Sequence, residues 1–269
     1  MSKKILRLGL IGKDVSKSLS ERMHTFILRE WGIECQYRRF SASQEEFATA
    51  MKILQTECDG FNVTIPYKRD AFAYIQSADE VAVACDAVNT VVTATGKGYN
   101  TDGAGFSLML EVAGISLRGE KVLVLGAGGS GRSSAVALKN AGASVWLYRR
   151  NERALKEICE QIGVAVCTDP EAGGFDILIN CTGVGMHETE GQSPVTSKAF
   201  RGAKRAVDLI YEPKKSAFLA IAEGEGLSIL NGESMLFYQA YYADCLYTKK
   251  TPSADEARAL YEKYQRSEI

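Results

Sequence analysis

The segment Lys121–Arg150 constrains the fold more than any other part of the sequence. It opens with an apolar run, Val122–Leu125, which is typical of a central parallel strand, and a glycine-rich turn follows at Gly126–Gly131. A helical pattern over Arg132–Asn140 and a second strand at Ser144–Leu147 complete the unit. In this order the glycines permit close approach of the backbone, and amides at the start of the helix can bind phosphate. The segment therefore predicts a Rossmann-type domain that binds a dinucleotide, with a turn that binds no ligand as the alternative.

The residues after the second strand bear on the choice of dinucleotide. About 20 residues after the glycines, a fold that prefers NAD usually places Asp or Glu to accept from the ribose 2′-hydroxyl. Tyr148, Arg149 and Arg150 stand there instead. Guanidinium groups can bind a 2′-phosphate, so the sequence favours NADP(H) over NAD(H). Simple solvation of one or both arginines at a strand end is the alternative.

Alternating strand and helix patterns indicate an α/β fold with two domains. In the first hundred residues the expected strands are Leu6–Ile11, Cys35–Phe40, Gly60–Val63 and Val88–Thr93, and the expected helices are Glu21–Trp31 and Gln44–Gln55. Such alternation predicts a mainly parallel sheet covered by helices. After residue 103 the pattern predicts a helix at Phe106–Ala113, and then, beyond the dinucleotide segment, strands near 176–180 and 206–209.

The domain boundaries follow from these patterns. The stretch from Met235 to Ser267 is helical and carries no strand signal, so we expect it to return to the first domain. Residues 1–103, completed by C-terminal helices in 236–269, would form an N-terminal α/β substrate-binding catalytic domain. Residues 104–235 would form an NADP-binding domain with a Rossmann-type doubly wound parallel sheet.

Charge and cysteine content exclude several classes of partner. The chain has 32 basic and 33 acidic residues, a net charge of -1, so we expect neither nucleic acid nor membrane as a partner. Seven cysteines without a C-x-x-C pair, and only two histidines, predict a reduced cytoplasmic protein without a metal site. Arg7 interrupts the first apolar run, which favours a buried strand over a signal peptide, and no apolar run approaches the roughly 20 residues that span a bilayer.

Two segments of the first domain carry candidate acid and base residues. A strand ends near Asn62 and breaks at Pro66, which places Lys68 at the lip of the sheet. Asp102 follows Tyr99 at the domain boundary, where we expect a cleft against the cofactor. A lysine paired with a carboxylate can move the proton that accompanies hydride transfer. An exposed lysine at a helix start, and a helix N-cap at Asp102, are the alternatives.

These segments belong to a longer series of motifs, in one order from about residue 9 to 243, that resembles the shikimate dehydrogenase family. The motifs are Ser18-Leu-Ser20 with Met23-His24, Asn62-Val-Thr64-Ile-Pro66-Tyr-Lys68, Ala87-Val-Asn89-Thr90, Asn100-Thr-Asp102-Gly103, Gly126–Gly131, Asn180-Cys-Thr182-Gly-Val-Gly185-Met186, Asp208-Leu-Ile-Tyr211-Glu-Pro213, and Asn231-Gly232 through Met235-Leu-Phe-Tyr-Gln239. The resemblance implies reversible reduction of 3-dehydroshikimate to shikimate by NADPH, on the pathway to chorismate and the aromatic amino acids.

The resemblance also implies a role for each matching residue. Lys68 would donate and accept the proton at the reacting oxygen, and Asp102 would hold both the lysine and a substrate hydroxyl. The substrate carboxylate would be bound by Ser18 and Ser20 with help from Tyr211, and the substrate hydroxyls by Thr64, Asn89 and Gln239.

On the cofactor side, the glycine loop would face the pyrophosphate, and its residues are Gly126, Ala127, Gly128, Gly129, Ser130 and Gly131. Arg149 and Arg150 would face the 2′-phosphate. The nicotinamide end would be lined by Thr182, Gly183 and Val184 and approached by Leu209, Gly232 and Glu80. For the last three, a core residue, a turn and a surface helix residue are the respective alternatives.

The sequence departs from the family pattern at the serine turn, where Lys17 and Glu21 stand in place of the usual His and Pro. The usual Asn-Arg-Thr after the second Rossmann strand is here Tyr148-Arg-Arg150. A quinate/shikimate dehydrogenase that uses NAD or NADP would share every motif. The rival functions of different chemistry are an amino-acid or folate-type dehydrogenase and an NADP-binding sensor without activity. A monomer or a homodimer is expected.

Overall fold

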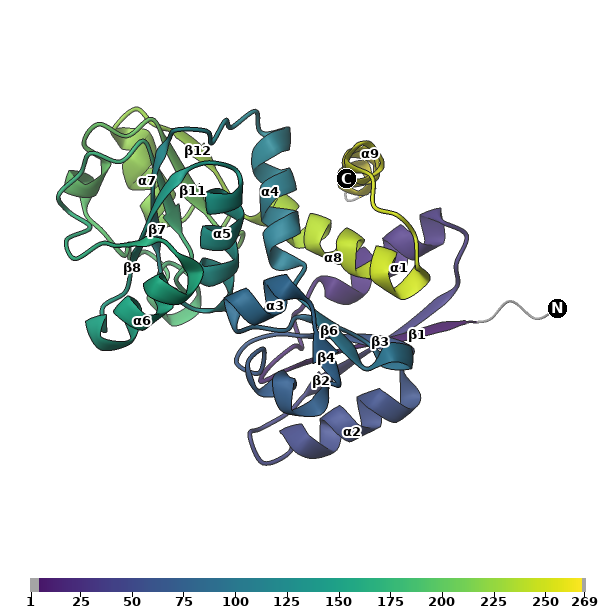
Figure 1. Ribbon diagram of the computed structural model, residues 1–269. Helices are drawn as coiled ribbons and strands as arrows, with labels where there is room; N and C mark the ends of the chain where they lie inside the picture. The colour runs from purple at the N-terminus through teal and green to yellow at the C-terminus, as the bar shows by residue number, and fades with distance from the viewer. Residues whose placement is uncertain (1–4, 268–269) are drawn as a thin grey trace. The chain divides into compact units, whose positions relative to one another are not determined.

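The computed structural model describes residues 5–267 of the chain, and these form two compact units (Figure 1). The first unit comprises Met1–Gly105 and Phe237–Ile269, and the second comprises Phe106–Leu236. The expected domain boundaries differ from these by one or two residues, and residues 1–4 and 268–269 of the expected first domain lie outside the described range. Within the described range, no helix combines the length and the apolar character needed to cross a membrane.

The sheet of the first unit has six strands in the order β2-β1-β3-β5-β6-β4. Strands β1 (Leu6–Gly12), β2 (Cys35–Ser41) and β3 (Gly60–Val63) are parallel, as the alternation of strands and helices predicts. The remaining strands are β4 (Ser77–Ala78), β5 (Thr90–Val92) and β6 (Lys97–Tyr99).

Strand β5 makes this first sheet mixed, because it is antiparallel to both β3 and β6. It is also shorter than the expected strand Val88–Thr93, since a short 3-10 turn begins at Thr93. Gly96, with φ +60°, closes this turn between β5 and β6. Only antiparallel neighbours can be joined by so short a connection. The alternation of strands and helices before β5 predicts a parallel strand instead.

Period-two alternation along β1 separates two cores in the first unit. Leu8 and Leu10 lie in a cluster with Leu28 and Tyr37 on one face of the sheet. Ile11 belongs to the cluster on the other face, which includes side chains of the helix α2 (Phe47–Glu57). Helix α1 (Ser20–Glu30) packs against β2, and α3 (Glu80–Cys85) packs near β6.

Helix α2 begins three residues later than the expected Gln44. The residues before it form a turn in which Ser43 N donates to Glu46 Oε2 over 2.9 Å and Glu46 N donates to Ser43 Oγ over 3.4 Å. This reciprocal bonding is the capping-box pattern, with Ser43 in the capping position and Glu46 three residues later, so the turn over residues 44–46 leads directly into α2. Two helices at the C-terminal end, α8 (Glu233–Thr248) and α9 (Ala254–Arg266), account for the helical pattern that ends the sequence.

The second unit contains a six-stranded parallel sheet in the order β12-β11-β10-β7-β8-β9. From β7 (Lys121–Leu125) the chain first adds β8 (Ser144–Tyr148) and β9 (Ala165–Val166) on one side. It then returns to add β10, β11 and β12 on the other, with bounds Ile177–Asn180, Arg205–Asp208 and Ser228–Leu230. The predicted doubly wound Rossmann sheet is therefore confirmed, with its switch point between β7 and β10.

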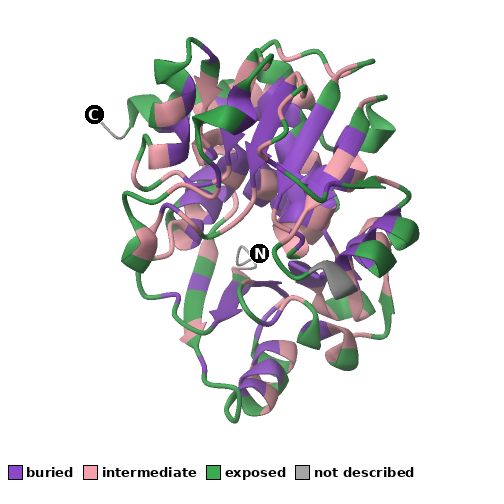
Figure 2. Ribbon diagram, turned by 90° about the vertical axis from the view of Figure 1, so that its left-hand side faces the viewer, coloured by how far each residue is buried: buried purple, intermediate pink, exposed green. Residues whose placement is uncertain are grey.

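Helices α5 (Gly129–Asn140) and α6 (Glu152–Ile162) pack on the β7–β9 half of this sheet, and α7 (Ala217–Gly224) packs on β11 and β12. The central strands are buried along most of their length (Figure 2). The edge strand β9 is only two residues long and is exposed at both of them. Helix α4 (Asp102–Val112) starts in the first unit and continues into the second.

Candidate active site and dinucleotide site

The two serines expected to bind a carboxylate lie in the turn that follows β1. Ser18 Oγ donates to Ser20 Oγ over 3.0 Å, and Ser20 N donates to Ser18 Oγ over 3.2 Å, so the two hydroxyls are held together. Ser18 is half-buried, while Ser20 is 9% exposed and is the first residue of α1.

The departure at Glu21 has a partner in the structure. Arg39 Nε lies 3.1 Å from Glu21 Oε2, and Arg39 Nη1 donates to the carbonyl of Ser16 over 2.5 Å. The arginine thus ties the start of α1 to the loop before the serine pair. Lys17, the other departure, is exposed.

Lys68 lies in the turn after β3, and Thr64 begins that turn. Thr64 N donates to the carbonyl of Ile11 over 2.8 Å, which ties the ends of β1 and β3 together. The carbonyl of Lys68 accepts from Val88 N over 2.8 Å, so the backbone of the lysine is fixed beside the chain that enters β5. Ligands of open α/β sheets bind at the carboxyl ends of parallel strands, and both the serine turn and Lys68 occupy that edge.

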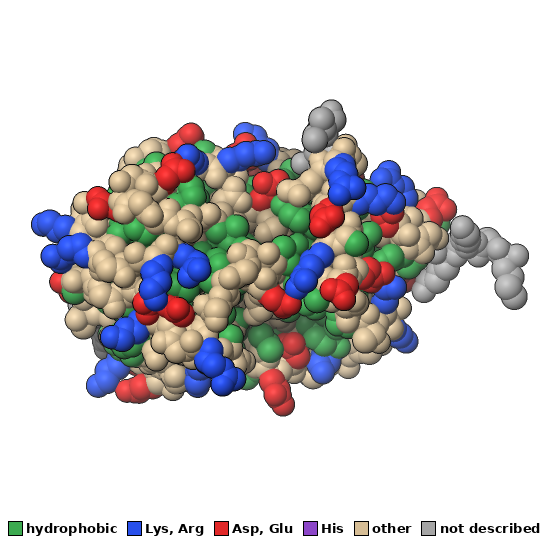
Figure 3. Space-filling model, turned by 90° about the horizontal axis from the view of Figure 1, so that it is seen from above, with side chains coloured by type: hydrophobic (Ala, Val, Ile, Leu, Met, Phe, Trp, Pro, Cys, Tyr) green, Lys and Arg blue, Asp and Glu red, His purple; other side chains and the backbone are tan. Residues whose placement is uncertain are grey.

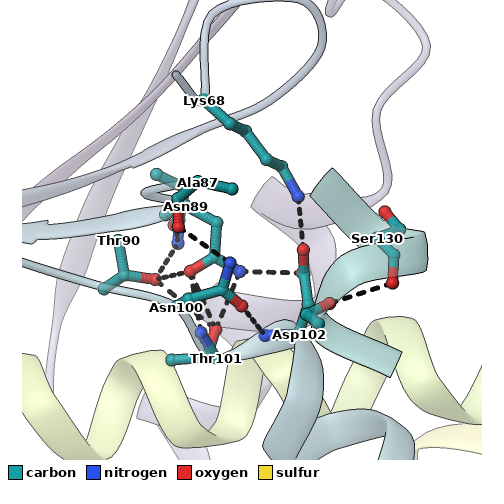
Figure 4. A network of polar contacts seen from close by, with 10 residues as sticks. Lys68, Ala87, Asn89, Thr90, Asn100, Thr101, Asp102 and Ser130 are labelled. Carbon is teal, nitrogen blue, oxygen red and sulfur yellow. Dashed lines mark hydrogen bonds and ion pairs between the residues drawn. The ribbon is translucent and has the colours of Figure 1, made fainter. Parts of the chain in front are cut away.

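Lys68 and Asp102 form the closest charged pair at this edge (Figure 4). Lys68 Nζ donates to Asp102 Oδ2 over 2.5 Å, and the side chains are 16% and 7% exposed. Asp102 is the first residue of α4, where a negative charge is favourable, and its amide donates to Asn100 Oδ1 over 3.0 Å. Asp102 is therefore not the N-cap of α4, because the side chain of Asn100 accepts the hydrogen bond from the first amide of the helix.

Asn89 holds the second carboxylate oxygen of Asp102. Its Nδ2 donates to Asp102 Oδ1 over 2.8 Å and to Thr101 Oγ1 over 3.1 Å. Its Oδ1 accepts from Thr101 N and from Thr90 Oγ1, both over 2.9 Å. Asn89 is 3% exposed, and the network around it fixes the carboxylate beside the lysine (Figure 4). A partly enclosed ammonium with a fixed counter-ion is suited to proton transfer at an oxygen.

Two further residues of the first unit, Gln239 and Glu80, were expected to contribute to the site. Gln239 is a half-buried residue of α8 and belongs to the first unit. Glu80 is at the first position of α3, after Asp79, whose side chain caps the helix by accepting from Ala82 N. It is exposed. A glutamate in the first turn stabilises the helix in any case, so the position of Glu80 is explained without a ligand.

Glycine is required at two positions of the dinucleotide loop by the fold itself, and at a third position it is not. Gly126 has φ +103°, and a Cβ at Gly131 would lie 1.9 Å from the carbonyl oxygen of Gly126, so neither position accepts a side chain. Gly128 differs, because its φ is −76° and a Cβ there would meet nothing within 4 Å. The protein itself does not require a glycine at this position, which precedes the first residue of α5. Space beside amides at a helix start is what a bound pyrophosphate needs.

Arg149 and Arg150 lie at the same edge of the second sheet as the glycine loop. They directly follow β8, and Gly126 N donates to the carbonyl of Tyr148 over 2.8 Å. Arg149 is half-buried and Arg150 is exposed. The arrangement places guanidinium groups at the end of the strand next to β7, where the ribose 2′ position of a dinucleotide is read in this fold.

A loop of hydrogen bonds organises Thr182, Gly183 and Val184 after β10. Thr182 N and Thr182 Oγ1 donate to Asn180 Oδ1 over 3.0 and 2.7 Å, and Asn180 Nδ2 donates to the carbonyl of Val184 over 3.2 Å. Val184 N in turn donates to Thr182 Oγ1 over 3.1 Å. The Asn180 side chain thus shapes the segment that is expected to line the nicotinamide end.

Leu209 and Gly232 lie against each other in the second unit. A Cβ at Gly232 would be 2.2 Å from the carbonyl oxygen of Leu209, so this close backbone approach requires glycine. Tyr211, half-buried, follows two residues after Leu209. Burial, and then the neighbouring Glu212, raise the pKa of Tyr211, so its hydroxyl stays protonated at neutral pH.

Several buried polar residues form contacts for which no role was predicted. Asp208 is fully buried; its Oδ1 accepts from Ile210 N over 2.9 Å, and its Oδ2 accepts from Ser216 Oγ and from Asn180 Nδ2 over 2.5 and 3.1 Å. Burial raises the pKa of Asp208. In the first unit, His24 Nδ1 lies 2.6 Å from Asp244 Oδ1, with both side chains fully buried. The signal in each case is a polar residue inside an apolar pattern, which does not by itself reveal its partner.

Basic and acidic side chains are interspersed over the face seen in Figure 3. Among residues 5–267, no group of three His, Cys, Asp or Glu side chains could hold a metal ion. The fold and the two sites together define a two-domain α/β protein in which one unit is a Rossmann dinucleotide-binding domain and the other carries a lysine–carboxylate pair.

Comparison with known proteins identifies the family. The family model described as "Shikimate dehydrogenase substrate binding domain" matches residues 10–91. A protein of Thermus thermophilus named shikimate dehydrogenase (NADP(+)) is 36% identical over 250 residues, which cover 92% of this chain and 94% of the relative. A protein of the same name from Caldanaerobacter subterraneus is 38% identical over 253 residues, covering 89% and 90%.

The solved structures agree with the sequences. The crystal structure of shikimate 5-dehydrogenase from Thermus thermophilus in complex with NADP(H) and shikimate is similar with a TM-score of 0.87 and 34% identity, covering 96% of this chain and 99% of that one. The chain belongs to the shikimate dehydrogenase family, and the resemblance noted in the sequence is confirmed.

Proposed function

We propose that this protein catalyses the reversible reduction of 3-dehydroshikimate to shikimate with NADPH, on the pathway to chorismate and the aromatic amino acids. The observation that carries the proposal is the 2.5 Å contact between Lys68 Nζ and Asp102 Oδ2. Lys68 lies at the same edge of the sheet as the serine turn. Relatives of this chain are named shikimate dehydrogenase (NADP(+)), and one is solved with NADP(H) and shikimate.

The first unit is the substrate-binding catalytic domain in this proposal, and the second is the NADP-binding domain. NADPH, when bound, supplies the hydride. Lys68 donates a proton to the ketone oxygen as it becomes a hydroxyl, and it accepts that proton in the reverse direction. Asp102 keeps the ammonium in place and accepts from a substrate hydroxyl. The buried amide of Asn89 prevents the carboxylate from turning away.

Directed hydrogen bonds select the substrate. Ser18 and Ser20, with Tyr211, bind the carboxylate, and Thr64, Asn89 and Gln239 bind hydroxyls. Asn89 also holds Asp102 and Thr101 through its two amide hydrogens. A site built of such groups rejects analogues that lack a hydroxyl, because its own polar groups would then be left unpaired.

The residues of the second unit fit an NADP molecule. The glycine loop and Ser130 bind the pyrophosphate, for which the space at Gly128 is the supporting observation. Arg149 and Arg150 bind the 2′-phosphate as charge-assisted donors. Thr182, Gly183, Val184, Leu209 and Gly232 shape the nicotinamide end, and Glu80 is the residue of the first unit that we assign to it.

A steady-state comparison tests the proposal. The purified protein is given shikimate or quinate, each with NADP+ or NAD+, and formation of the reduced cofactor is followed by its absorbance. We expect the highest kcat/KM for shikimate with NADP+. Comparable turnover of quinate would instead favour a quinate/shikimate dehydrogenase, and absence of turnover with all four pairs would contradict the proposal.

A further inference from the structure

The carboxylate of Asp208 is fully buried at the end of β11, on the carboxyl edge of the second sheet. Among the described residues, three groups contact it and all three donate: Ile210 N to Oδ1, and Ser216 Oγ and Asn180 Nδ2 to Oδ2. This is the pattern of an ionised carboxylate, which accepts hydrogen bonds and cannot donate one. Burying a charge carries a desolvation cost that the packing of a sheet does not require, so the charge points to a further role.

Asn180, the register partner of Asp208 on β10, uses every hydrogen-bonding position of its side-chain amide. Its Nδ2 donates to Asp208 Oδ2 over 3.1 Å and to the carbonyl of Val184 over 3.2 Å. Its Oδ1 accepts from Thr182 N over 3.0 Å and from Thr182 Oγ1 over 2.7 Å. The amide therefore joins the buried carboxylate on one side to the segment Thr182–Val184 on the other.

The charge of Asp208 sets the orientation of the Asn180 amide. Because a carboxylate only accepts, Nδ2 of Asn180 must face it, and Oδ1 is then directed at Thr182. In the opposite orientation the amide would direct its NH2 group at Thr182 N, donor against donor. Asp208 and Asn180 both lie in paired strands, whereas Thr182–Val184 is a loop, so the sheet determines the shape of the loop.

We infer that Asp208 is a positioning residue for the nicotinamide end of the cofactor: through Asn180 it holds Thr182–Val184 in the shape that receives the nicotinamide. Leu209, assigned to the same end, is tied to the same point, because its N donates to the carbonyl of Asn180 over 2.9 Å. The inference rests on the proposed function, since it assumes that this loop binds the nicotinamide of NADP(H). It gives a role to an aspartate that makes no contact with the cofactor in the proposal.

The test is Asp208→Asn, which keeps the shape of the side chain and removes its charge. The new amide has one oxygen for two fixed donors, Ile210 N and Asn180 Nδ2. Since the Ile210 amide belongs to the backbone and cannot turn, the oxygen stays with it and the Asn180 contact is lost. We expect kcat for shikimate oxidation at saturating NADP+ to fall by about tenfold to a hundredfold, because the nicotinamide is no longer aligned with the substrate.

A cofactor fragment separates this loss from general damage to the second unit. Adenosine 2′,5′-bisphosphate carries the 2′-phosphate but no nicotinamide, and its affinity for Asp208→Asn should stay within about twofold of the wild type, because it does not reach the loop. Calorimetric titration with this fragment also counts the binding-competent sites, and kcat is expressed per competent site. A purely structural role would lower Tm and the number of competent sites and leave kcat per site unchanged.

Asp176→Asn is the matched control. Asp176 precedes β10 at the opposite edge of the same sheet, where it accepts from Lys121 N over 2.8 Å and contacts Lys204 Nζ at 2.9 Å. Each variant removes one carboxylate that binds a backbone amide and a side chain, so both should lower Tm. Asp176→Asn should keep the wild-type kcat per competent site, because no contact of Asp176 leads to Thr182–Val184.

A double-mutant cycle tests whether Asp208 acts through Asn180. Asn180→Ala should lower kcat per competent site to a similar extent, and in this background Asp208→Asn should have no further effect, because the donor that needs the charge is gone. A normal kcat in Asp208→Asn, or an equal further fall in the Asn180→Ala background, overturns the inference. If Asp208→Asn binds no fragment, Asn180→Ala decides, and a normal kcat per site in that variant overturns the inference.

The wild type separates the inference from the proposed function. If it oxidises shikimate and the variants at Asp208 and Asn180 keep its kcat per site, the inference alone is wrong. If the wild type does not oxidise shikimate, the proposed function is wrong and the inference with it.

Discussion

Asn89 Nδ2 lies 2.8 Å from Asp102 Oδ1, on the carboxylate whose other oxygen accepts from Lys68. Asp102 is therefore held on both oxygens, by a neutral amide that is 3% exposed and by an ammonium. Because the carboxylate is fixed, it holds the Lys68 ammonium in one position. The group that fixes the carboxylate from the other side, the Asn89 amide, carries no charge. It also explains why an asparagine that directly precedes β5 belongs to the same site as residues of the β3 turn and of α4.

Lys68→Ala is expected to lower kcat for shikimate oxidation by about a hundredfold or more, which is the usual contribution of a positioned proton-transfer group. Binding of NADP+, measured by fluorescence titration, should persist, because the glycine loop and the arginines belong to the second unit. Lys52→Ala, an exposed lysine of α2, is the control and should leave both quantities unchanged. A near-normal kcat in Lys68→Ala would show that another group moves the proton.

Gly128→Ala is expected to weaken NADP+ binding without lowering Tm. A Cβ at this position meets nothing within 4 Å and φ is −76°, so the folded protein accepts alanine, whereas the added methyl group would occupy space against the pyrophosphate. Gly131→Ala is the matched comparison, since its Cβ would lie 1.9 Å from the Gly126 carbonyl oxygen and should lower Tm. The pair is compared by thermal unfolding and by titration with NADP+. Undiminished affinity in Gly128→Ala would place the pyrophosphate elsewhere.

The sequence predicted the central strands of the Rossmann half, because these strands are mostly apolar and the turn after β7 is marked by glycine. It did not predict β4, β6, β9 and β12, which are two or three residues long, and it missed the antiparallel pairing of β5. Strands this short are specified by their neighbours in space rather than by local pattern.

The candidate site was also predicted only in part. Lys68 and Asp102 could be named from residue types and family motifs, and the structure brings them together. Other buried polar contacts of the first unit, such as Asn62 with Tyr37 and His24 with Asp244, join residues 25 and 220 positions apart and leave no periodic signal in the sequence. The cytoplasmic location, the monomeric or homodimeric state and the roles of the individual site residues stay predictions.

Arg149→Ala is expected to weaken NADP+ far more than NAD+, because a guanidinium that binds the 2′-phosphate has no partner on NAD+. A charge-assisted hydrogen bond is worth roughly 1.5 to 3 kcal/mol, or about tenfold to a hundredfold in KM for NADP+. Arg150→Ala, at the more exposed neighbour, should show the same direction with a smaller effect. Steady-state KM values for both cofactors provide the measurement, and equal losses for NADP+ and NAD+ would mean that Arg149 does not bind the phosphate.

The buried pair of His24 and Asp244 should make stability depend on pH. Burial raises the pKa of Asp244 from 3.8 to about 6, against the opposing effect of His24. Between these values the folded protein keeps a proton that the unfolded chain has released. The free energy of unfolding therefore falls as pH rises through this window.

Asp244→Asn tests this dependence, because the amide keeps a polar contact with His24 but cannot release a proton. Urea unfolding at several pH values should show the wild type losing stability relative to Asp244→Asn as pH rises from about 4 to about 6, by up to about 3 kcal/mol. Asp255→Asn is the control, since that side chain is 96% exposed and should leave the wild-type slope unchanged. Parallel curves for the wild type and Asp244→Asn would show that Asp244 ionises at an ordinary pH despite its burial.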